Sequence, residues 1–183
     1  TALALFETHV DAAVLLRELG AGEPTAVTPL MFEYGLLERA RSQRKRIVLP
    51  EGGDDRILQA AGTLLSRSVV DLTILGDEAE VRARASGLGV DLSAAQVLSP
   101  TDPELRERFA QEYARVRAHK GMTVEVARDI VTDVSYFGTM MVHLGLADGM
   151  VSGAAHTTAH TITPALQFIK TKEGVATVSS VFF

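Results

Sequence analysis

Short apolar runs alternate with longer amphipathic segments through most of this chain, and this alternation constrains the fold more than any other feature. The runs carry residues typical of buried strands, whereas the longer segments repeat apolar residues at helical spacing. Such alternation is built with right-handed crossovers into a mostly parallel sheet covered by helices on both faces. The sequence therefore predicts an α/β fold with three α/β/α layers. The expected strands are 46–50, 71–76, 94–98, 147–153 and 174–183, and the expected helices are 30–43, 54–67, 77–86, 102–121, 123–133, 134–145 and 157–171.

Composition excludes several classes of protein. The net charge of −5 argues against nucleic-acid binding, which needs a basic face. The absence of cysteine rules out a disulfide framework and a thiolate zinc site. We find no signal peptide and no apolar run of about 18 residues, so we expect a cytoplasmic protein.

The two ends of the chain suggest that it is part of a longer protein. A helical pattern over residues 1–20 is followed by a Gly/Pro/Ala/Thr-rich stretch at 20–28. We expect residues 1–27 to be the tail of a preceding domain with its linker, and 28–183 to begin a second domain. The apolar run 174–183 is an unusual place for a terminus, although a true final strand packed under a helix would also explain it.

The segment 148–163, "DGMVSGAAHTTAHTIT", points most directly to function. It predicts a strand that passes through the small residues 153–155 into a helix with several hydroxyl groups. Backbone N–H groups and the dipole at a helix N-terminus favour an anion. We therefore expect a phosphate or carboxylate site that includes Ser152, Gly153 and Thr157, with further hydroxyl donors at Thr158 and Thr161.

Two arginines are candidates for anion binding. Arg56 lies in the first turn of the helix that follows "PEGGDD", where a cation is unfavourable unless it has an anionic partner. That partner could be a ligand, or a nearby carboxylate such as Asp54 or Glu51. Arg117 lies in "RVRAHKG" at a helix C-terminus, where cations are favourable without any ligand.

His156 and His160 are four residues apart, and this spacing places both on one face of a helix. Such a pair can bind zinc, but the Glu of HExxH and a third ligand are missing. We therefore expect no metal, and hydrogen bonds from the histidines to an anion or to the backbone. Ser152 is not expected to be a nucleophile because it lacks the GxSxG elbow.

Four segments together resemble the phosphate acetyl/butyryltransferase family. They are "IVLPEGGDDRILQAA", "RAHKGMTVEVARDIVTD", "FGTMMVHLGLADGMVSGAAHTTAHTI" and "PALQFIKT", in the expected order, and the resemblance covers residues 29–183. It implies a two-lobed unit similar to isocitrate and isopropylmalate dehydrogenases, with the active site between the lobes. Residues 1–20 resemble the end of the regulatory region in the long form of the family. The chain would thus be truncated at its C-terminus.

The resemblance also implies a reaction, in which acetyl-CoA and phosphate give acetyl phosphate and CoA. Coenzyme A is then a substrate, no cofactor or metal is bound, and a homodimer is expected. The family's catalytic base and its thiol-positioning serine come from a later part of the family's sequence, so no catalytic residue is assigned in this chain.

Substrate-binding roles are implied for residues that match the family's motifs. They are Arg56, Arg117, Ser152, Gly153, His156 and Thr157. Many members carry arginine where this chain has Thr163, and the loss of that cation would weaken phosphate or CoA binding.

Three other functions remain open. One is phosphate butyryltransferase activity, because the acyl pocket cannot be inferred from this part of the family. Another is the acetyl-CoA-sensing domain of a malic enzyme. The third is a non-enzymatic binding or oligomerisation module, which a wide separation of Arg56 from Arg117 would favour.

Overall fold

The computed structural model describes residues 11, 14 and 27–178. The chain divides into two compact units, residues 1–39 and 40–183. The expected helix at 1–20 and most of the 20–28 linker lie outside the described residues. Helix α3 (Pro29–Ser42) confirms the helix expected at 30–43, and it contains no buried residue.

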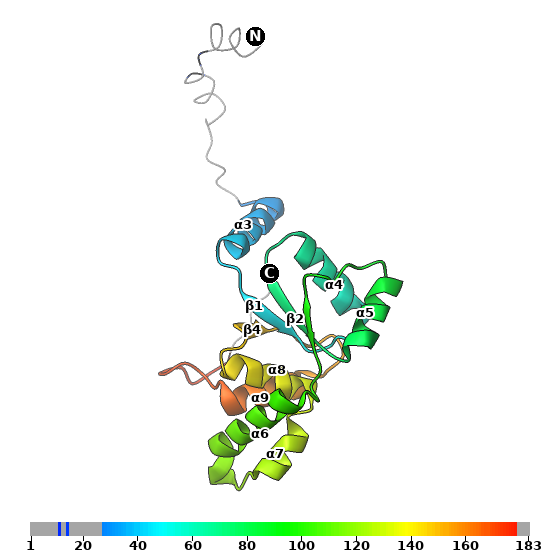
Figure 1. Ribbon diagram of the computed structural model, residues 1–183. Coiled ribbons are helices and arrows are strands. Elements are labelled where there is room, and N and C mark those ends of the chain that lie inside the picture. Colours follow the sequence, from blue (N-terminus) through cyan, green and yellow to red (C-terminus); the bar gives the residue numbers. More distant parts are fainter. Residues whose placement is uncertain (1–10, 12–13, 15–26, 179–183) are drawn as a thin grey trace. The chain divides into compact units, whose positions relative to one another are not determined.

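The second unit is built on a parallel sheet of four strands in the order β3-β2-β1-β4 (Figure 1). The strands confirm four of the five expected runs. They are β1 (Arg46–Leu49), β2 (Asp71–Leu75), β3 (Gln96–Leu98) and β4 (Gly149–Met150). The α/β class predicted from the sequence is correct.

The expected strand at 174–183 is wrong over its described part. Residues 174–178 are exposed and belong to no strand, and 179–183 lie outside the described residues. Val175 and Val178 are 48% and 60% exposed. Their apolar β-type sequence has no neighbouring strand in the described structure, and a strand needs such a neighbour for its hydrogen bonds.

Each helix from α4 onward begins at an Asp or Thr that caps it. The cap side chain accepts a hydrogen bond from a backbone N–H of the first turn, which would otherwise lack a partner. The capped helices are α4 (Asp55–Ser66), α5 (Glu78–Gly87), α6 (Pro103–Arg117), α7 (Val124–Ile130), α8 (Val134–His143) and α9 (Thr158–Phe168). A 3₁₀ turn, η1 (Ala118–Lys120), follows α6 and ends at Gly121, whose φ of 75° suits glycine.

Two helical layers cover opposite faces of the sheet. Helices α4 and α5 pack on one side against β2 and β3, and α8 and α6 form the layer on the other side, with α7 beyond α6 (Figure 1). Gly138 in α8 allows this approach, because a Cβ at that position would lie 2.6 Å from Met150 Sδ. The second unit therefore has the predicted three layers.

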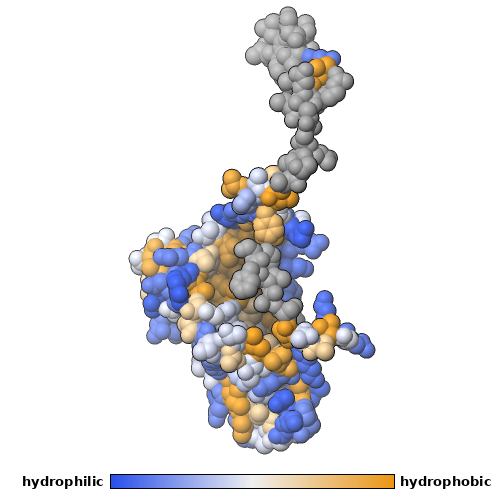
Figure 2. All heavy atoms as spheres, turned by 180° about the vertical axis from the view of Figure 1, so that it is seen from behind, coloured by the Kyte–Doolittle hydropathy of each residue, from blue (hydrophilic) through white to orange (hydrophobic). Residues whose placement is uncertain are grey.

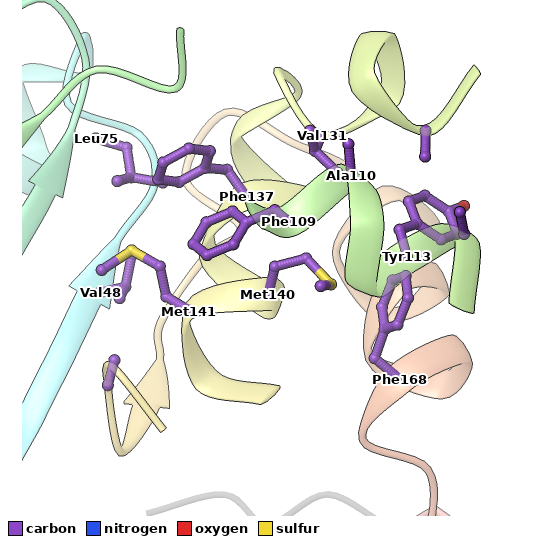
Figure 3. Packing of buried hydrophobic residues seen from close by; sticks show 13 residues of the cluster. Val48, Leu75, Phe109, Ala110, Tyr113, Val131, Phe137, Met140, Met141 and Phe168 are labelled. Carbon is purple, nitrogen blue, oxygen red and sulfur yellow. The ribbon is translucent and has the colours of Figure 1, made fainter. Parts of the chain in front are cut away.

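The main core lies between the sheet and the α6–α8 layer. Phe109 and Phe137 are completely buried and meet edge to face, with ring centroids 4.8 Å apart (Figure 3). Met141 lies between these rings and Val48 of β1 in the same view. This packing fixes α8, and with it the chain that leads into β4.

The opposite face of the sheet keeps an apolar groove of about 340 Å³. Side chains from β1, β2 and α4 line it, among them Ile47, Leu72 and Leu64, together with Val151 just after β4. Figure 2 shows apolar side chains gathered in a hollow on that side of the molecule.

We expect Phe137→Ala to destabilise the second unit by about 3–5 kcal/mol, the usual cost of removing a fully buried aromatic ring. Urea denaturation would measure the change in the free energy of unfolding. Val126→Ala is the control, because Val126 is 51% exposed, and it should change stability little. Equal losses in the two variants would contradict this account of the core.

Candidate functional site

The strand order reverses between β1 and β4, so the carboxyl ends of these two strands are where a ligand crevice is expected. Strands β2 and β3 extend the sheet on one side of β1, and the chain then returns to place β4 on the other side. Ligands of open α/β sheets bind where the strand order reverses in this way. Two segments meet at this crevice: Glu51–Arg56 after β1, and residues 151–157 between β4 and α9.

An ion pair between Arg46 and Asp148 aligns β1 with β4 at the end of these strands opposite the crevice. Asp148 accepts hydrogen bonds from the backbone N–H of Arg46 at 2.8 Å and from its guanidinium at 2.7 and 3.2 Å. These bonds lower the pKa of Asp148 to about 2. The register between β1 and β4 is thereby fixed at the end of the strands opposite the crevice.

The centre of the site is Glu51, whose side chain is 1% exposed. Its Oε2 accepts hydrogen bonds from the backbone N–H groups of Gly153 and Ala154 at 3.0 and 2.8 Å. Its Oε1 accepts from those of Ala155 and His156 at 2.7 and 2.9 Å, and Oε1 also lies 2.9 Å from His156 Nδ1. One carboxylate therefore satisfies a turn of four amides and an imidazole.

This contact corrects a central expectation. The backbone N–H groups at 153–156 were expected to be free for an external anion, but the chain's own carboxylate occupies them. From the sequence, Glu51 is expected only as a possible partner for Arg56. A carboxylate directly after a buried central strand was the available signal, and its target about 100 residues later could not be inferred.

The environment of Glu51 favours its ionised form. Burial alone would raise the pKa, but the amides of Ala155 and Ala154 together with the ring and amide of His156 outweigh it. The pKa falls from 4.5 to about 2. Glu51 is therefore an anion at neutral pH that accepts hydrogen bonds and donates none.

Arg56 lies beside this turn. Its Nη2 donates to the carbonyl oxygen of Ala154 at 2.5 Å, while Nε and Nη2 also bind the carboxylate of Asp54 at 3.0 and 2.7 Å. Arg56 therefore has a carboxylate partner in Asp54, and its guanidinium also reaches the crevice. Its side chain is 69% exposed, and Nη1 has no hydrogen-bond partner among the described residues.

Arg117 lies elsewhere. It ends α6, one turn after Tyr113, whose hydroxyl donates to Gln167 at 3.0 Å near the C-terminal end of α9. The crevice is at the other end of α9, and the nine helical steps from Thr158 to Gln167 span about 14 Å. In Figure 1 the end of α6 lies far from the sheet. The expected convergence of Arg56 and Arg117 on one anion is therefore not found.

The hydroxyl groups of Ser152 and Thr157 accept hydrogen bonds from other groups of the protein. Ser152 Oγ accepts from the hydroxyl of Thr161 at 3.3 Å, and Thr157 caps α9 by accepting from the backbone N–H of His160 at 3.3 Å. Thr163 donates its hydroxyl to the carbonyl of Ala159 within the helix at 2.6 Å. Ser152, Gly153, His156 and Thr157 lie in or next to the turn that Arg56 contacts through the carbonyl of Ala154.

The histidines do not form the helical pair that was expected. His156 precedes α9 and belongs to the turn, so only His160 is helical. His160 Nε2 lies 2.8 Å from Asp133 Oδ2, and the two imidazole rings meet edge to face with centroids 4.7 Å apart. Among the described residues, no group of three side chains is suited to hold a metal ion.

Comparison with known proteins identifies the family of this chain. The family model for phosphate acetyl/butaryl transferase matches residues 31–183. The chain belongs to this family.

The phosphate acetyltransferase of Nitratidesulfovibrio vulgaris is 50% identical over 182 residues, which are 100% of this chain and 26% of the relative. That of Corynebacterium glutamicum is 55% identical over 153 residues, 83% of this chain and 46% of the relative. A phosphotransacetylase structure from Streptococcus pyogenes superposes with a TM-score of 0.74 at 39% identity, covering 82% of this chain and 45% of that one. The chain thus spans between a quarter and a half of the length of the proteins it matches.

None of the described helices has the length and apolar character needed to cross a membrane.

The ionised Glu51 predicts a definite pH dependence of stability. Because its folded pKa is depressed, its contribution is present above about pH 4.5 and is lost as pH falls toward 2. The shift corresponds to about 3 kcal/mol. The stability difference between the natural protein and Glu51→Gln, measured by urea denaturation, should therefore shrink by this order between pH 6 and pH 2.5.

Glu173→Gln is the matched control, because Glu173 is exposed and outside the turn. Its difference from the natural protein should stay nearly constant with pH. A constant difference for Glu51→Gln as well would show that the carboxylate is not held ionised by the turn.

Proposed function

We propose that the enzyme carrying this chain is a phosphate acetyltransferase, which transfers an acetyl group between CoA and inorganic phosphate. Family membership over residues 31–183 supports this, as do relatives of that name at 50–55% identity. The observation that carries the proposal is the turn at 153–156, which Glu51 holds at the carboxyl ends of β1 and β4, with the exposed guanidinium of Arg56 beside it. The acetyl group is favoured over butyryl because these relatives are named for acetyl transfer.

We place the phosphate, or the phosphate group of acetyl phosphate, against Arg56 Nη1 and the residues Ser152, His156 and Thr157. Gly153 contributes by leaving this side of the turn open: its φ is 119°, and nothing lies within 4 Å of where a Cβ would be. Arg56 remains a donor while its other nitrogens are held, so its orientation is set before the anion binds. Arg117 is not part of this proposed site.

The reaction balances without a metal or redox cofactor. Monohydrogen phosphate attacks the thioester carbon, the C–S bond breaks as a C–O bond forms, and the phosphate loses one proton while the sulfur of CoA gains one. The acetyl group is already activated as a thioester or an acyl phosphate. The chain's own residues need only bind the anion, hold its charge and handle one proton.

The organisation of the parent protein is also part of the proposal. The match to N. vulgaris covers the whole chain and 26% of the relative, whereas the match to C. glutamicum covers 153 residues and 46% of that relative. This pattern supports residues 1–27 as the end of a region present ahead of the domain in longer family members. The resemblance adds two further predictions, a homodimer and a role in cytoplasmic acetate metabolism.

The direct test is formation of acetyl phosphate from acetyl-CoA and phosphate by the enzyme that carries this chain, followed by trapping as the hydroxamate. We expect phosphate-dependent release of CoA in equal amounts. Release of CoA without acetyl phosphate would overturn the proposed activity.

We expect Arg56→Gln to raise the KM for phosphate at least tenfold. A hydrogen bond to a charged group contributes about 1.5–3 kcal/mol, and each 1.4 kcal/mol is a tenfold change in affinity. Arg84→Gln is the control, since Arg84 is also an exposed arginine paired with an aspartate, Asp55, outside the proposed site. If the two variants behave alike, Arg56 has no special role in phosphate binding.

A further inference from the structure

The His156 ring is held from several directions. Glu51 Oε1 lies 2.9 Å from Nδ1, and the same oxygen accepts from the backbone N–H of His156. The ring of His160 abuts it edge to face, and His160 is itself held by Asp133. The side chain remains 26% exposed at the crevice. His156 is therefore an oriented imidazole with access to solvent.

The hydrogen bond to Glu51 decides where the proton of the neutral ring resides. Because the ionised carboxylate can only accept, Nδ1 carries the proton. Nε2 then holds a lone pair, and it has no hydrogen-bond partner among the described residues. A carboxylate that fixes the tautomer of a histidine in this way also fixes the direction in which its other nitrogen points.

The proposed reaction requires such an acceptor. The attacking phosphate still carries a P–O–H proton, and Arg56 can only donate hydrogen bonds. The oxygens of Ser152 and Thr157 already accept hydrogen bonds from Thr161 and His160. In the turn beside Arg56, His156 Nε2 is the side-chain acceptor that remains without a donor among the described residues.

We propose that His156 Nε2 accepts the hydrogen bond of the P–O–H group of bound phosphate, and that Glu51 is a positioning residue that fixes the required tautomer and the turn. This inference rests on the proposed function and assigns a proton-accepting role within that site. As the C–O bond to the acetyl carbon forms, the proton moves from the phosphate oxygen to Nε2. It then leaves for solvent, which restores the neutral ring, while the sulfur of CoA takes its proton from the catalytic base expected in a later part of the family's sequence.

The first test is spectroscopic and needs no turnover. The ¹⁵N and ¹³C shifts of the imidazole of His156 report which nitrogen carries the proton, and the signal is assigned by its loss in His156→Gln. We expect the neutral ring to be in the Nδ1–H form in the natural protein, and to shift toward Nε2–H in Glu51→Gln. A predominant Nε2–H form in the natural protein would overturn the inference, even if Glu51→Gln fails to fold.

The second test separates the two substrates. We expect His156→Gln to raise the KM for phosphate about tenfold and to lower kcat, with the KM for acetyl-CoA changed less than twofold. His119→Gln is the control, because His119 is exposed in η1 and lies outside the site. Glu51→Gln should resemble His156→Gln in its kinetics, and the double variant should be little worse than either single one.

The possible failures are distinguishable. If the natural enzyme forms acetyl phosphate but His156→Gln leaves the KM for phosphate unchanged, the role of His156 is refuted and the proposed function stands. If the natural enzyme forms no acetyl phosphate, the proposed function fails, and the role of His156 in it fails too. Additive effects of the two variants would refute Glu51 as acting through His156.

Discussion

The candidate site depends on one buried carboxylate. Glu51 binds four successive amides and an imidazole that lie more than 100 residues away in sequence. Turns of this kind usually receive their anion from a ligand. Here the protein supplies it, which keeps the turn in one conformation before any substrate arrives. Preorganisation of this kind removes the ordering cost that a flexible phosphate loop would incur on binding.

This arrangement separates two tasks that the sequence could not distinguish. The amides of the turn serve to hold the fold, and the groups that face outward are the ones proposed to bind the substrate. Arg56 spans both, because its Nη2 reaches the Ala154 carbonyl while Nη1 remains available. The proposed site therefore offers a ligand fewer hydrogen-bond donors than a free helix N-terminus would. Its specificity then depends on a few side chains.

Local signals predicted the fold well. The alternation of strands and helices predicted the elements from β1 to α9 to within a few residues, because it depends on neighbours in sequence. The site is harder to predict. Arg56 and the 152–157 turn were expected there because each lies just after a strand. The link from Glu51 to that turn, and the distance of Arg117 from it, depend on tertiary packing that periodicity does not encode.

The pairing of β1 with β4 has a consequence for how the protein is made. Strand β1 ends at Leu49, yet its neighbour begins at Gly149, so this contact closes a long loop, whereas β1 and β2 are much nearer in sequence. Contacts of long sequence separation form late because the chain must first lose the corresponding entropy. During synthesis on the ribosome, Glu51 emerges well before its amide partners and stays exposed until residue 156 has left the exit tunnel. The crevice is therefore among the last parts of this unit to be assembled, and premature release of the nascent chain would leave β1 as an edge strand with Glu51 exposed beyond its carboxyl end.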